Sequence, residues 1–200
     1  FWENARKAFF DQGIVGRKWL DMPGDLGYPR NQIDPDSEKG KGVMAEKILI
    51  VVDMQNDFID GVLGTREAVA IVPHVKKKIE AYRAEKKTVI FTRDTHGEDY
   101  LLTQEGRKLP VEHCIRGSHG WKISSKLDTA DSEIIDKPTF GSYDLIERLE
   151  ELDQEDALES VELVGLCTDI CVISNAMLVK NRFPELQVMV DAECCAGVMP

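Results

Sequence analysis

The sequence lacks long apolar runs and an excess of basic charge. No stretch approaches the ~18 consecutive apolar residues of a membrane-spanning helix. The first residues, FWENARKAFFDQG, also lack the apolar segment of a secretory signal. Lysine and arginine number 25 against 36 aspartates and glutamates, so the formal net charge is −11. This acidity argues against nucleic acid or an anionic membrane as the main partner.

Cysteine is also sparse. The chain has five cysteines in 200 residues, an odd number with no spacing typical of a disulfide framework. We therefore expect reduced thiols and a cytoplasmic location. What the sequence does contain is a 42% apolar fraction, enough to bury a core, which excludes disorder of the whole chain. The length suits one domain with a short appendage.

The first 43 residues differ in composition from the rest. They hold seven basic and seven acidic side chains, so the whole charge of −11 falls in residues 44–200. Residues 1–43 end in the Gly- and Lys-rich stretch Ser37–Gly42, which is typical of a flexible linker. Apolar residues at helical spacing predict a short amphipathic helix within residues 1–10. We divide the chain into an N-terminal extension and linker of unknown role, 1–43, and a domain, 44–200.

Predicted strands and helices alternate along the domain. β-branched apolar runs predict strands, and apolar residues at helical spacing predict helices. The strands are expected at 47–53, 88–94, 133–137, 161–166 and 186–191, and the helices at 67–86, 142–152 and 169–182. Pro73 either kinks the first helix or marks its true start. The alternation predicts an α/β fold, a three-layer α/β/α arrangement with a mostly parallel central sheet. Ligands of such sheets bind beyond the carboxyl ends of the strands.

Cys171 lies where a strand turns into a helix, in the segment GLCTDICV. Thr168 is a candidate N-cap, which places Cys171 at about the third helical position. Unpaired N–H groups and the helix dipole there favour a thiolate, so we predict a lowered pKa and a nucleophile. The same amides could hold an oxyanion. The alternatives are a buried structural cysteine or a redox or metal pair with Cys167.

Two further ionisable residues end predicted strands. Asp53 follows a buried apolar strand, so its carboxyl group must be solvated, paired or functional. Beside a cysteine it could accept the thiol proton, and otherwise it caps a helix or anchors a loop. Lys137 ends a short strand. It is a solvated surface residue unless it points inward, where it could pair with Asp53 and stabilise a thiolate.

A third group of residues could bind a metal. Asp94 and His96 alternate along predicted extended backbone, and His113 follows within the long loop 95–127. One carboxylate and two imidazoles suit Zn²⁺, Fe²⁺ or Mn²⁺, with open positions for water or substrate. The alternative is a set of ordinary hydrogen-bonded loop residues. A loop of this length is usually functional or mobile.

Taken together, these segments resemble the isochorismatase-like cysteine hydrolases, and among them the nicotinamidases. The resemblance runs from residue 47 to residue 198 and depends on the order, spacing and strand-end placement of five short segments. They are VVDMQNDF (51–58), FTRDTH (91–96), PVEHC (110–114), DKPTF (136–140) and GLCTDICV (165–172).

The resemblance implies an isochorismatase-like hydrolase fold and a catalytic triad of Asp53, Lys137 and Cys171. It also implies a cis peptide bond between Leu166 and Cys167, with the backbone amides of Cys167 and Cys171 forming the oxyanion hole. A divalent metal, most often zinc and alternatively iron or manganese, would be bound by the metal-ligand set. That set is Asp94, His96 and His113.

The implied activity is hydrolysis of a small-molecule amide. Nicotinamide would become nicotinic acid and ammonia through a cysteine thioester, a step of NAD salvage and pyridine nucleotide biosynthesis. The metal would meet the pyridine nitrogen, and Phe58 and Trp121 would contact the ring. Pro110 stands where many nicotinamidases have an aromatic residue. That substitution keeps open another amide, carbamoyl or vinyl-ether substrate, and the unusual chain ends keep open a non-catalytic binding or assembly protein.

Two other features depart from the family pattern. Residues 98–102 offer no further histidine, so waters are expected to complete the metal coordination. The chain also stops soon after the last predicted strand, where the family usually continues into a helix. We expect the helix predicted in residues 1–10 to cover the exposed face, in its own chain or in a neighbour's. A homo-oligomer is therefore left open.

Overall fold

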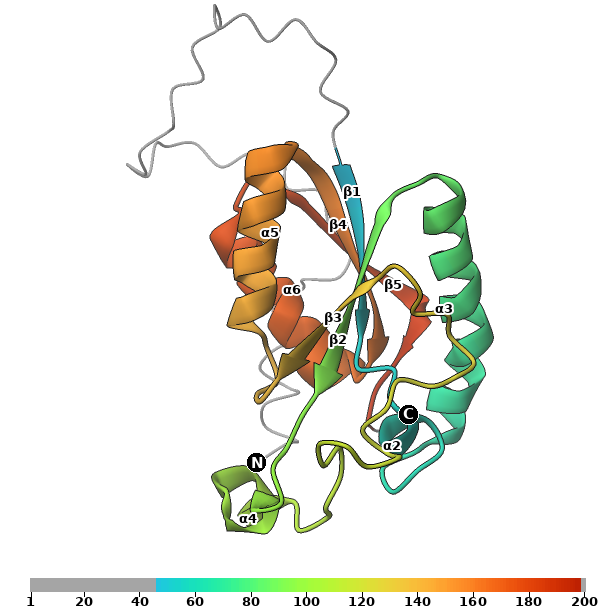
Figure 1. The fold of residues 1–200 in the computed structure, drawn as a ribbon, viewed down its shortest axis with the longest axis vertical. Coiled ribbons are helices and arrows are strands. Elements are labelled where there is room, and N and C mark those ends of the chain that lie inside the picture. The colour runs from blue at the N-terminus through green and yellow to red at the C-terminus, as the bar shows by residue number, and fades with distance from the viewer. Residues whose placement is uncertain (1–45, 199–200) are drawn as a thin grey trace, which may run out of the picture. The chain divides into compact units, whose positions relative to one another are not determined.

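The computed structural model describes residues 46–198 (Figure 1). The expectations for the extension 1–43, including the helix within residues 1–10, lie outside these described residues. The chain divides into two units, residues 1–40 and residues 41–200. The paragraphs below concern the second of these units alone.

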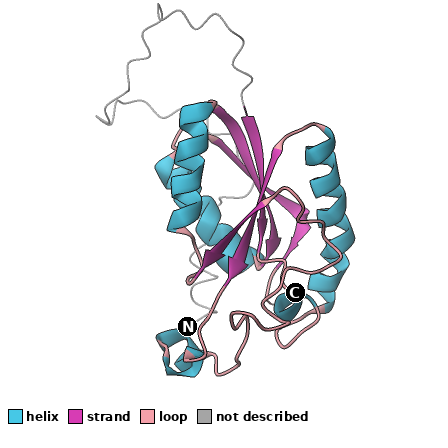
Figure 2. Ribbon diagram, viewed as in Figure 1, coloured by secondary structure: helices cyan, strands magenta, loops and turns pink. Residues whose placement is uncertain are grey.

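A parallel sheet of five strands forms the centre of the unit, in the order β3-β2-β1-β4-β5. All four neighbouring pairs are parallel, so every strand ends at the same edge (Figure 2). The strands are β1 (Glu46–Val52), β2 (Thr88–Asp94), β3 (Glu133–Lys137), β4 (Leu158–Leu166) and β5 (Gln187–Ala196).

Helices cover both faces of the sheet, which gives the predicted three layers (Figure 1). The long helices are α3 (Arg66–Ala84) on one face and α5 (Tyr143–Glu155) and α6 (Ile173–Arg182) on the other. Shorter helical segments are α2 (Asn56–Ile59), α4 (Gln104–Lys108), a 3-10 turn (Tyr100–Leu102) and a π-helical turn (Thr168–Val172). No helix among residues 46–198 is long and apolar enough to span a membrane.

The alternation of side chains along β1 builds the two cores. Ile48 and Ile50 belong to the core shared with α5 and α6. Leu49 and Val51 belong to the core shared with α3. A strand buried on both faces must be apolar throughout, which explains the continuous ILIVV run of β1.

The strand order indicates where on the carboxyl edge a ligand would bind. The chain runs outward from β1 to β2 and β3, and then returns to β4 on the other side of β1. Ligands of doubly wound sheets bind at such a reversal. At this point β1 and β4 approach closely, since Gly165 has φ +115° and a Cβ there would lie 2.1 Å from the Val52 carbonyl oxygen. Only glycine fits this position.

Most predicted elements are confirmed, two of them with the expected bounds. These are the strands 88–94 and 133–137. Ser142 caps α5 as its N-cap, accepting a hydrogen bond from the backbone N–H of Leu145. The last strand is longer than predicted and continues to Ala196.

One of two alternatives for Pro73 is excluded, and one local prediction was wrong. Pro73 lies inside α3, which begins at Arg66 after the Thr65 cap, so the proline does not mark the start of the helix. Thr168 is not an N-cap: the capping position is Cys167, and Thr168 begins a π-helical turn that precedes α6. The chain winds more widely there than the α-helical spacing implied.

Candidate active site

Four strands deliver ionisable or nucleophilic groups to the carboxyl edge of the sheet. Asp53 follows β1, Asp94 ends β2 and Lys137 ends β3. Cys171 lies in the π-helical turn after β4. Because all these strands are parallel, residues separated by up to 118 positions meet in one place.

Lys137 is the centre of the cluster. It is fully buried, so its ammonium group must be paired. Its Nζ lies 2.6 Å from Asp53 Oδ2, 3.4 Å from Cys171 Sγ and 3.4 Å from Asp94 Oδ1. Nζ also donates a hydrogen bond to the carbonyl oxygen of Thr139 at 3.2 Å. The surface alternative for Lys137 is therefore excluded by its burial.

Asp53 is also fully buried, in a strained backbone conformation with φ +47°. Thr92 donates a hydrogen bond from Oγ1 to Asp53 Oδ1 at 2.8 Å, which leaves Oδ2 facing Lys137. Burial raises the pKa of the Asp53 carboxyl group, and the positive charge of Lys137 opposes that rise. A carboxylate with a raised pKa is a better proton acceptor than an exposed one.

The predicted lowering of the Cys171 pKa is wrong. Burial raises the pKa of the Cys171 thiol well above its ordinary value, the Asp53 carboxylate adds to the rise, and Lys137 opposes it. Cys171 is 5% exposed, and removal of its thiol from water outweighs the dipole of a five-residue turn. A cysteine with a raised pKa needs a nearby base to accept its proton before the sulfur can act as a nucleophile.

The Leu166–Cys167 peptide bond is cis, as the family resemblance implied. Cys167 is half-buried beside the thiol-bearing turn, and its carbonyl oxygen accepts hydrogen bonds from the backbone N–H groups of Ile170 and Val172. The assignment of the Cys167 and Cys171 amides to an oxyanion hole stays a prediction.

Asp94, His96 and His113 converge next to Lys137. All three are buried, and one ligand atom from each lies within 4.8 Å of the others. Asp94 Oδ2 is 3.0 Å from His96 Nε2 and 3.7 Å from His113 Nε2. Burial would raise the pKa of the Asp94 carboxyl group, but the adjacent His96 imidazole and the Lys137 ammonium group hold it below its ordinary value.

Several details fit a divalent cation at this point. His113 Nδ1 lies 2.8 Å from the Val111 carbonyl oxygen, which directs Nε2 towards Asp94. Such a second contact orients metal-binding histidines. Among the described residues, buried His96 Nε2 lacks a well-oriented hydrogen-bond partner, as does Asp53 Oδ2. The donor set of one carboxylate and two imidazoles suits zinc, iron or manganese.

Aromatic rings surround the two imidazoles. The ring of Phe58, which is half-buried, has its centroid 5.6 Å from that of His113. Tyr100 is fully buried, with its ring 4.6 Å from His96 and 4.9 Å from His113. Its hydroxyl donates a hydrogen bond to the Leu109 carbonyl oxygen at 3.0 Å. Phe58 therefore lies where a planar substrate could contact it.

Trp121 has other contacts than those predicted. Its indole N–H donates a hydrogen bond to Thr95 Oγ1 at 2.8 Å, and the Arg93 guanidinium group stacks 3.5 Å from the ring centroid. Arg93 and Thr95 alternate with Asp94 and His96 along extended backbone and so point the other way. This placement does not support Trp121 as a substrate-binding residue, because one ring face and the N–H group are already engaged.

Four residues near the cluster were not predicted from the sequence as site residues. Glu105 Oε1, in α4, lies 4.0 Å from Nε2 of both His96 and His113. Buried Asn175 donates hydrogen bonds to the carbonyl oxygens of Cys171 and Phe140. Gln55 and Tyr100 complete this group. Only tertiary contacts distinguish them from ordinary polar or aromatic residues of helices and loops.

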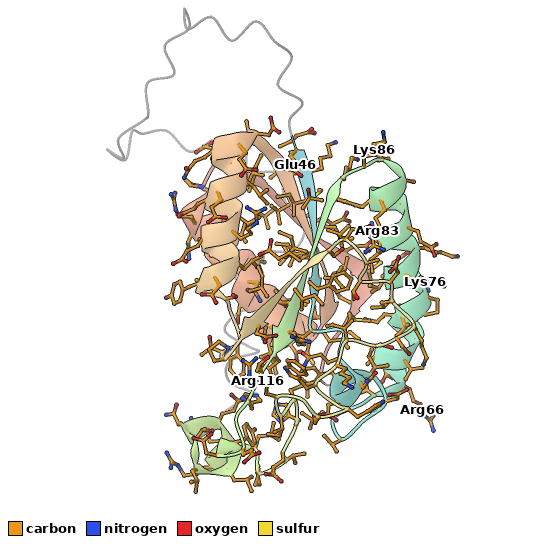
Figure 3. All side chains as sticks on the ribbon, viewed as in Figure 1. Glu46, Arg66, Lys76, Arg83, Lys86 and Arg116 are labelled. Carbon is orange, nitrogen blue, oxygen red and sulfur yellow. The ribbon has the colours of Figure 1, made fainter. Side chains whose placement is uncertain are left out.

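Two surface hollows lie elsewhere. One of about 520 Å³ lies around the start of β2, and another of about 390 Å³ lies beside the second half of α3; Arg83 lines both. Figure 3 labels Arg83 and Lys86 at that end and Arg116 at the other. Arg83 is already bound to Asp128, the Ala130 carbonyl oxygen and Ser132. Reactive groups gather at the carboxyl edge, so we assign the site to that edge.

Known proteins share this architecture. The model of the isochorismatase domain matches residues 47–200. A nicotinamidase/pyrazinamidase of Mycobacterium tuberculosis is 27% identical over 158 residues, covering 72% of this chain and 84% of that protein. The zinc complex of the Pyrococcus horikoshii pyrazinamidase superposes with a TM-score of 0.66 at 26% identity, covering 78% of this chain and 88% of that one. The N-carbamoylsarcosine amidase of Thermoplasma acidophilum superposes with a TM-score of 0.64 at 26% identity, covering 78% of this chain and 86% of that one.

Proposed function

Because this chain belongs to the isochorismatase family of hydrolases, we propose that it is a metal-dependent nicotinamidase that cleaves nicotinamide to nicotinic acid and ammonia through a thioester on Cys171. One observation carries the proposal: the buried Asp53–Lys137–Cys171 cluster adjoins a second cluster with the donor set of a metal site. Two curated relatives, 27% and 26% identical to this chain, are named as nicotinamidases, which supports the proposal.

The first half of the reaction is acyl transfer to sulfur. Asp53 accepts the proton of the Cys171 thiol, and the thiolate attacks the carboxamide carbon. Lys137, positively charged between both groups, stabilises the thiolate that forms. The amides of Cys167 and Cys171 stabilise the oxyanion of the tetrahedral intermediate. Asp53 then returns its proton to the leaving nitrogen, so ammonia departs and a thioester remains.

The second half is hydrolysis of that thioester. Asp53 takes a proton from a water molecule, whose oxygen attacks the thioester carbonyl carbon. The carbon–sulfur bond breaks, the carboxylic acid leaves, and the proton returns to the sulfur of Cys171. A raised pKa of Asp53 serves both halves, since the carboxylate must accept and release the same proton in turn.

Asp94, His96 and His113 would hold a divalent metal, zinc in the first instance. When bound, such an ion supplies a Lewis acid that can take the pyridine nitrogen of the substrate and orient its ring. The protein's own contribution is to hold Asp94, a proposed metal ligand, with its Oδ1 3.4 Å from Lys137 Nζ, so that a substrate oriented by the metal would lie beside the nucleophile. Phe58 would contact the ring.

The sequence and one structural relative also support a second substrate class. Pro110 replaces the aromatic residue that the nicotinamidase resemblance implies, and one structural relative is named as an N-carbamoylsarcosine amidase. A carbamoyl amide would use the same cysteine chemistry without a pyridine ring. Aromatic stacking on one side of the substrate would then be unnecessary.

The test is ammonia release from a panel of amides by the full chain, assayed with added Zn²⁺ and with a chelator. The panel holds nicotinamide, pyrazinamide, benzamide and N-carbamoylsarcosine. Benzamide matches nicotinamide in shape but lacks the ring nitrogen. The proposal predicts turnover of nicotinamide that exceeds that of benzamide and is lost with the chelator. Faster turnover of N-carbamoylsarcosine, unaffected by the chelator, would replace it with the second class.

A further inference from the structure

Gln55 is a neutral polar side chain with no exposed surface, two residues after Asp53. A buried carboxamide must satisfy its oxygen and both its N–H groups or lose stability. Gln55 Oε1 accepts a hydrogen bond from the Asp94 backbone N–H at 2.7 Å. Its Nε2 donates to the Asp94 carbonyl oxygen at 2.8 Å and to the Trp121 carbonyl oxygen at 2.9 Å. All three partners are backbone groups of distant segments.

These bonds continue the sheet where its backbone pairing ends. The β1–β2 ladder runs to the pair Val51 and Phe91, and the Asp53 N–H still reaches the Thr92 carbonyl oxygen. At Asp53 the chain turns with φ +47° and leaves the ladder. The Gln55 side chain then binds both polar groups of the Asp94 backbone, in the way a neighbouring strand would.

From these contacts we infer that Gln55 is a positioning residue, whose carboxamide sets the backbone of Asp94 and thereby the place of its carboxylate between the metal site and Lys137. The Asp94 carboxylate makes two contacts that depend on this placement. Its Oδ2 lies 3.0 Å from His96 Nε2, and its Oδ1 lies 3.4 Å from Lys137 Nζ. A shift of the Asp94 backbone would alter both.

The inference also explains how one turn serves both halves of the site. Asp53 supplies the base, and Gln55, from the same turn, holds the metal-ligand strand and the loop at Trp121. The distance between the base and the metal ligand is thereby determined by a single short segment. The inference rests on the proposed function only in requiring that Asp94, His96 and His113 bind a metal.

Gln55→Met tests the inference, since methionine keeps the length of the side chain but has no amide. Asn56→Ala is the matched control: Asn56 Nδ2 donates to the His119 carbonyl oxygen at 2.9 Å and has no bond to Asp94. The dissociation constant for Zn²⁺ is measured by competition with a chromophoric chelator, on proteins shown by circular dichroism to be folded. No substrate is needed.

Loss of an outer contact to a metal ligand typically weakens metal binding about 10–100-fold. We expect that loss in Gln55→Met and an unchanged constant in Asn56→Ala. Equal Zn²⁺ affinity in the wild-type protein and folded Gln55→Met would overturn the inference and leave the proposed function standing. A wild-type protein that does not bind Zn²⁺ would overturn the metal part of the proposed function and this inference with it.

If Gln55→Met does not fold, a measurement on the unmodified protein tests the inference instead. The side-chain amide of Gln55 is buried and bonded twice, so in ¹⁵N-labelled, metal-free protein its protons should exchange slowly with water. The Asp94 backbone amide should be protected as well. Rapid exchange of both in the metal-free state would mean that the contacts do not hold Asp94 in place, and would overturn the inference.

Discussion

Replacing Lys137 by methionine should destabilise the protein severely as well as inactivate it. The ammonium group is fully buried and lies against Asp53, Asp94 and Cys171. Removing one partner of a buried ion pair leaves an uncompensated charge and costs about 3–5 kcal/mol. Because domains have free energies of unfolding of about 5–15 kcal/mol, this is a large fraction of the total.

The loss should depend on pH, with a sign that follows from Asp53. Burial already raises the pKa of Asp53, and Lys137 opposes that rise, so the variant should have an even higher folded-state pKa. The folded variant then binds a proton that the unfolded chain releases above about pH 3.9. Its stability therefore falls as pH rises from about 4 through the folded pKa, and its deficit is smaller near pH 4 than at pH 7.

Urea unfolding in chelator-containing buffer, at pH 7 and at the lowest pH where both proteins fold, measures these free energies. Lys47→Met is the matched control, since Lys47 pairs with Glu159 at 2.9 Å on the surface and its loss should be within experimental error. Asp53→Asn combined with Lys137→Met should recover part of the stability and none of the activity. If Lys137→Met unfolds at the same urea concentration as Lys47→Met, the buried-charge reasoning is refuted.

Four other predictions concern separate parts of the site and fold. Cys171→Ala should abolish ammonia release while its circular dichroism stays native; if this variant released ammonia at the wild-type rate, Cys171 would not be the nucleophile. The rate in wild-type protein should fall as pH falls through an apparent pKa above the ordinary aspartate value of about 3.9, because burial raises that of Asp53; a rate independent of pH down to that value would count against Asp53 as base. His113→Ala should lower bound Zn²⁺ per chain by elemental analysis, and an unchanged metal content would exclude His113 as a ligand. Gly165→Ala should lower the free energy of unfolding, measured in urea, by more than about 2 kcal/mol and by more than Gly117→Ala does. Both glycines have positive φ, but only at Gly165 would a new Cβ meet another atom, at 2.1 Å. Equal losses in the two variants would refute the close-approach argument.

The sequence predicted the strands well because their limits depend on local chemistry. The run 88–94 is mostly apolar or β-branched, and the short run 133–137 has two adjacent isoleucines at its centre. Both runs end at charged residues, and the structure has the same bounds. The strand-end placement of Asp53, Asp94 and Lys137 followed from this, since parallel strands end at one edge. Their convergence could therefore be expected before any coordinates were known.

What the sequence could not predict depends on contacts between distant segments. Burial raises the pKa of Cys171 and the nearby Asp53 carboxylate adds to the rise, whereas the local helix position predicted a lowered pKa. Trp121 stacks on Arg93, a pairing set by the path of the loop rather than by its composition. Gln55 is an ordinary loop residue until its partner, Asp94, is seen 39 positions away.

The most direct test of the account is to look for the acyl group on sulfur. Wild-type protein with Zn²⁺ is mixed with nicotinamide, quenched in acid during turnover, digested and analysed by mass spectrometry. The account predicts a nicotinoyl group on the peptide that contains Cys171, absent from Cys171→Ala and removed when hydroxylamine cleaves thioesters. Release of ammonia from nicotinamide by a protein that never carries this group, or that carries it on another cysteine, would contradict it.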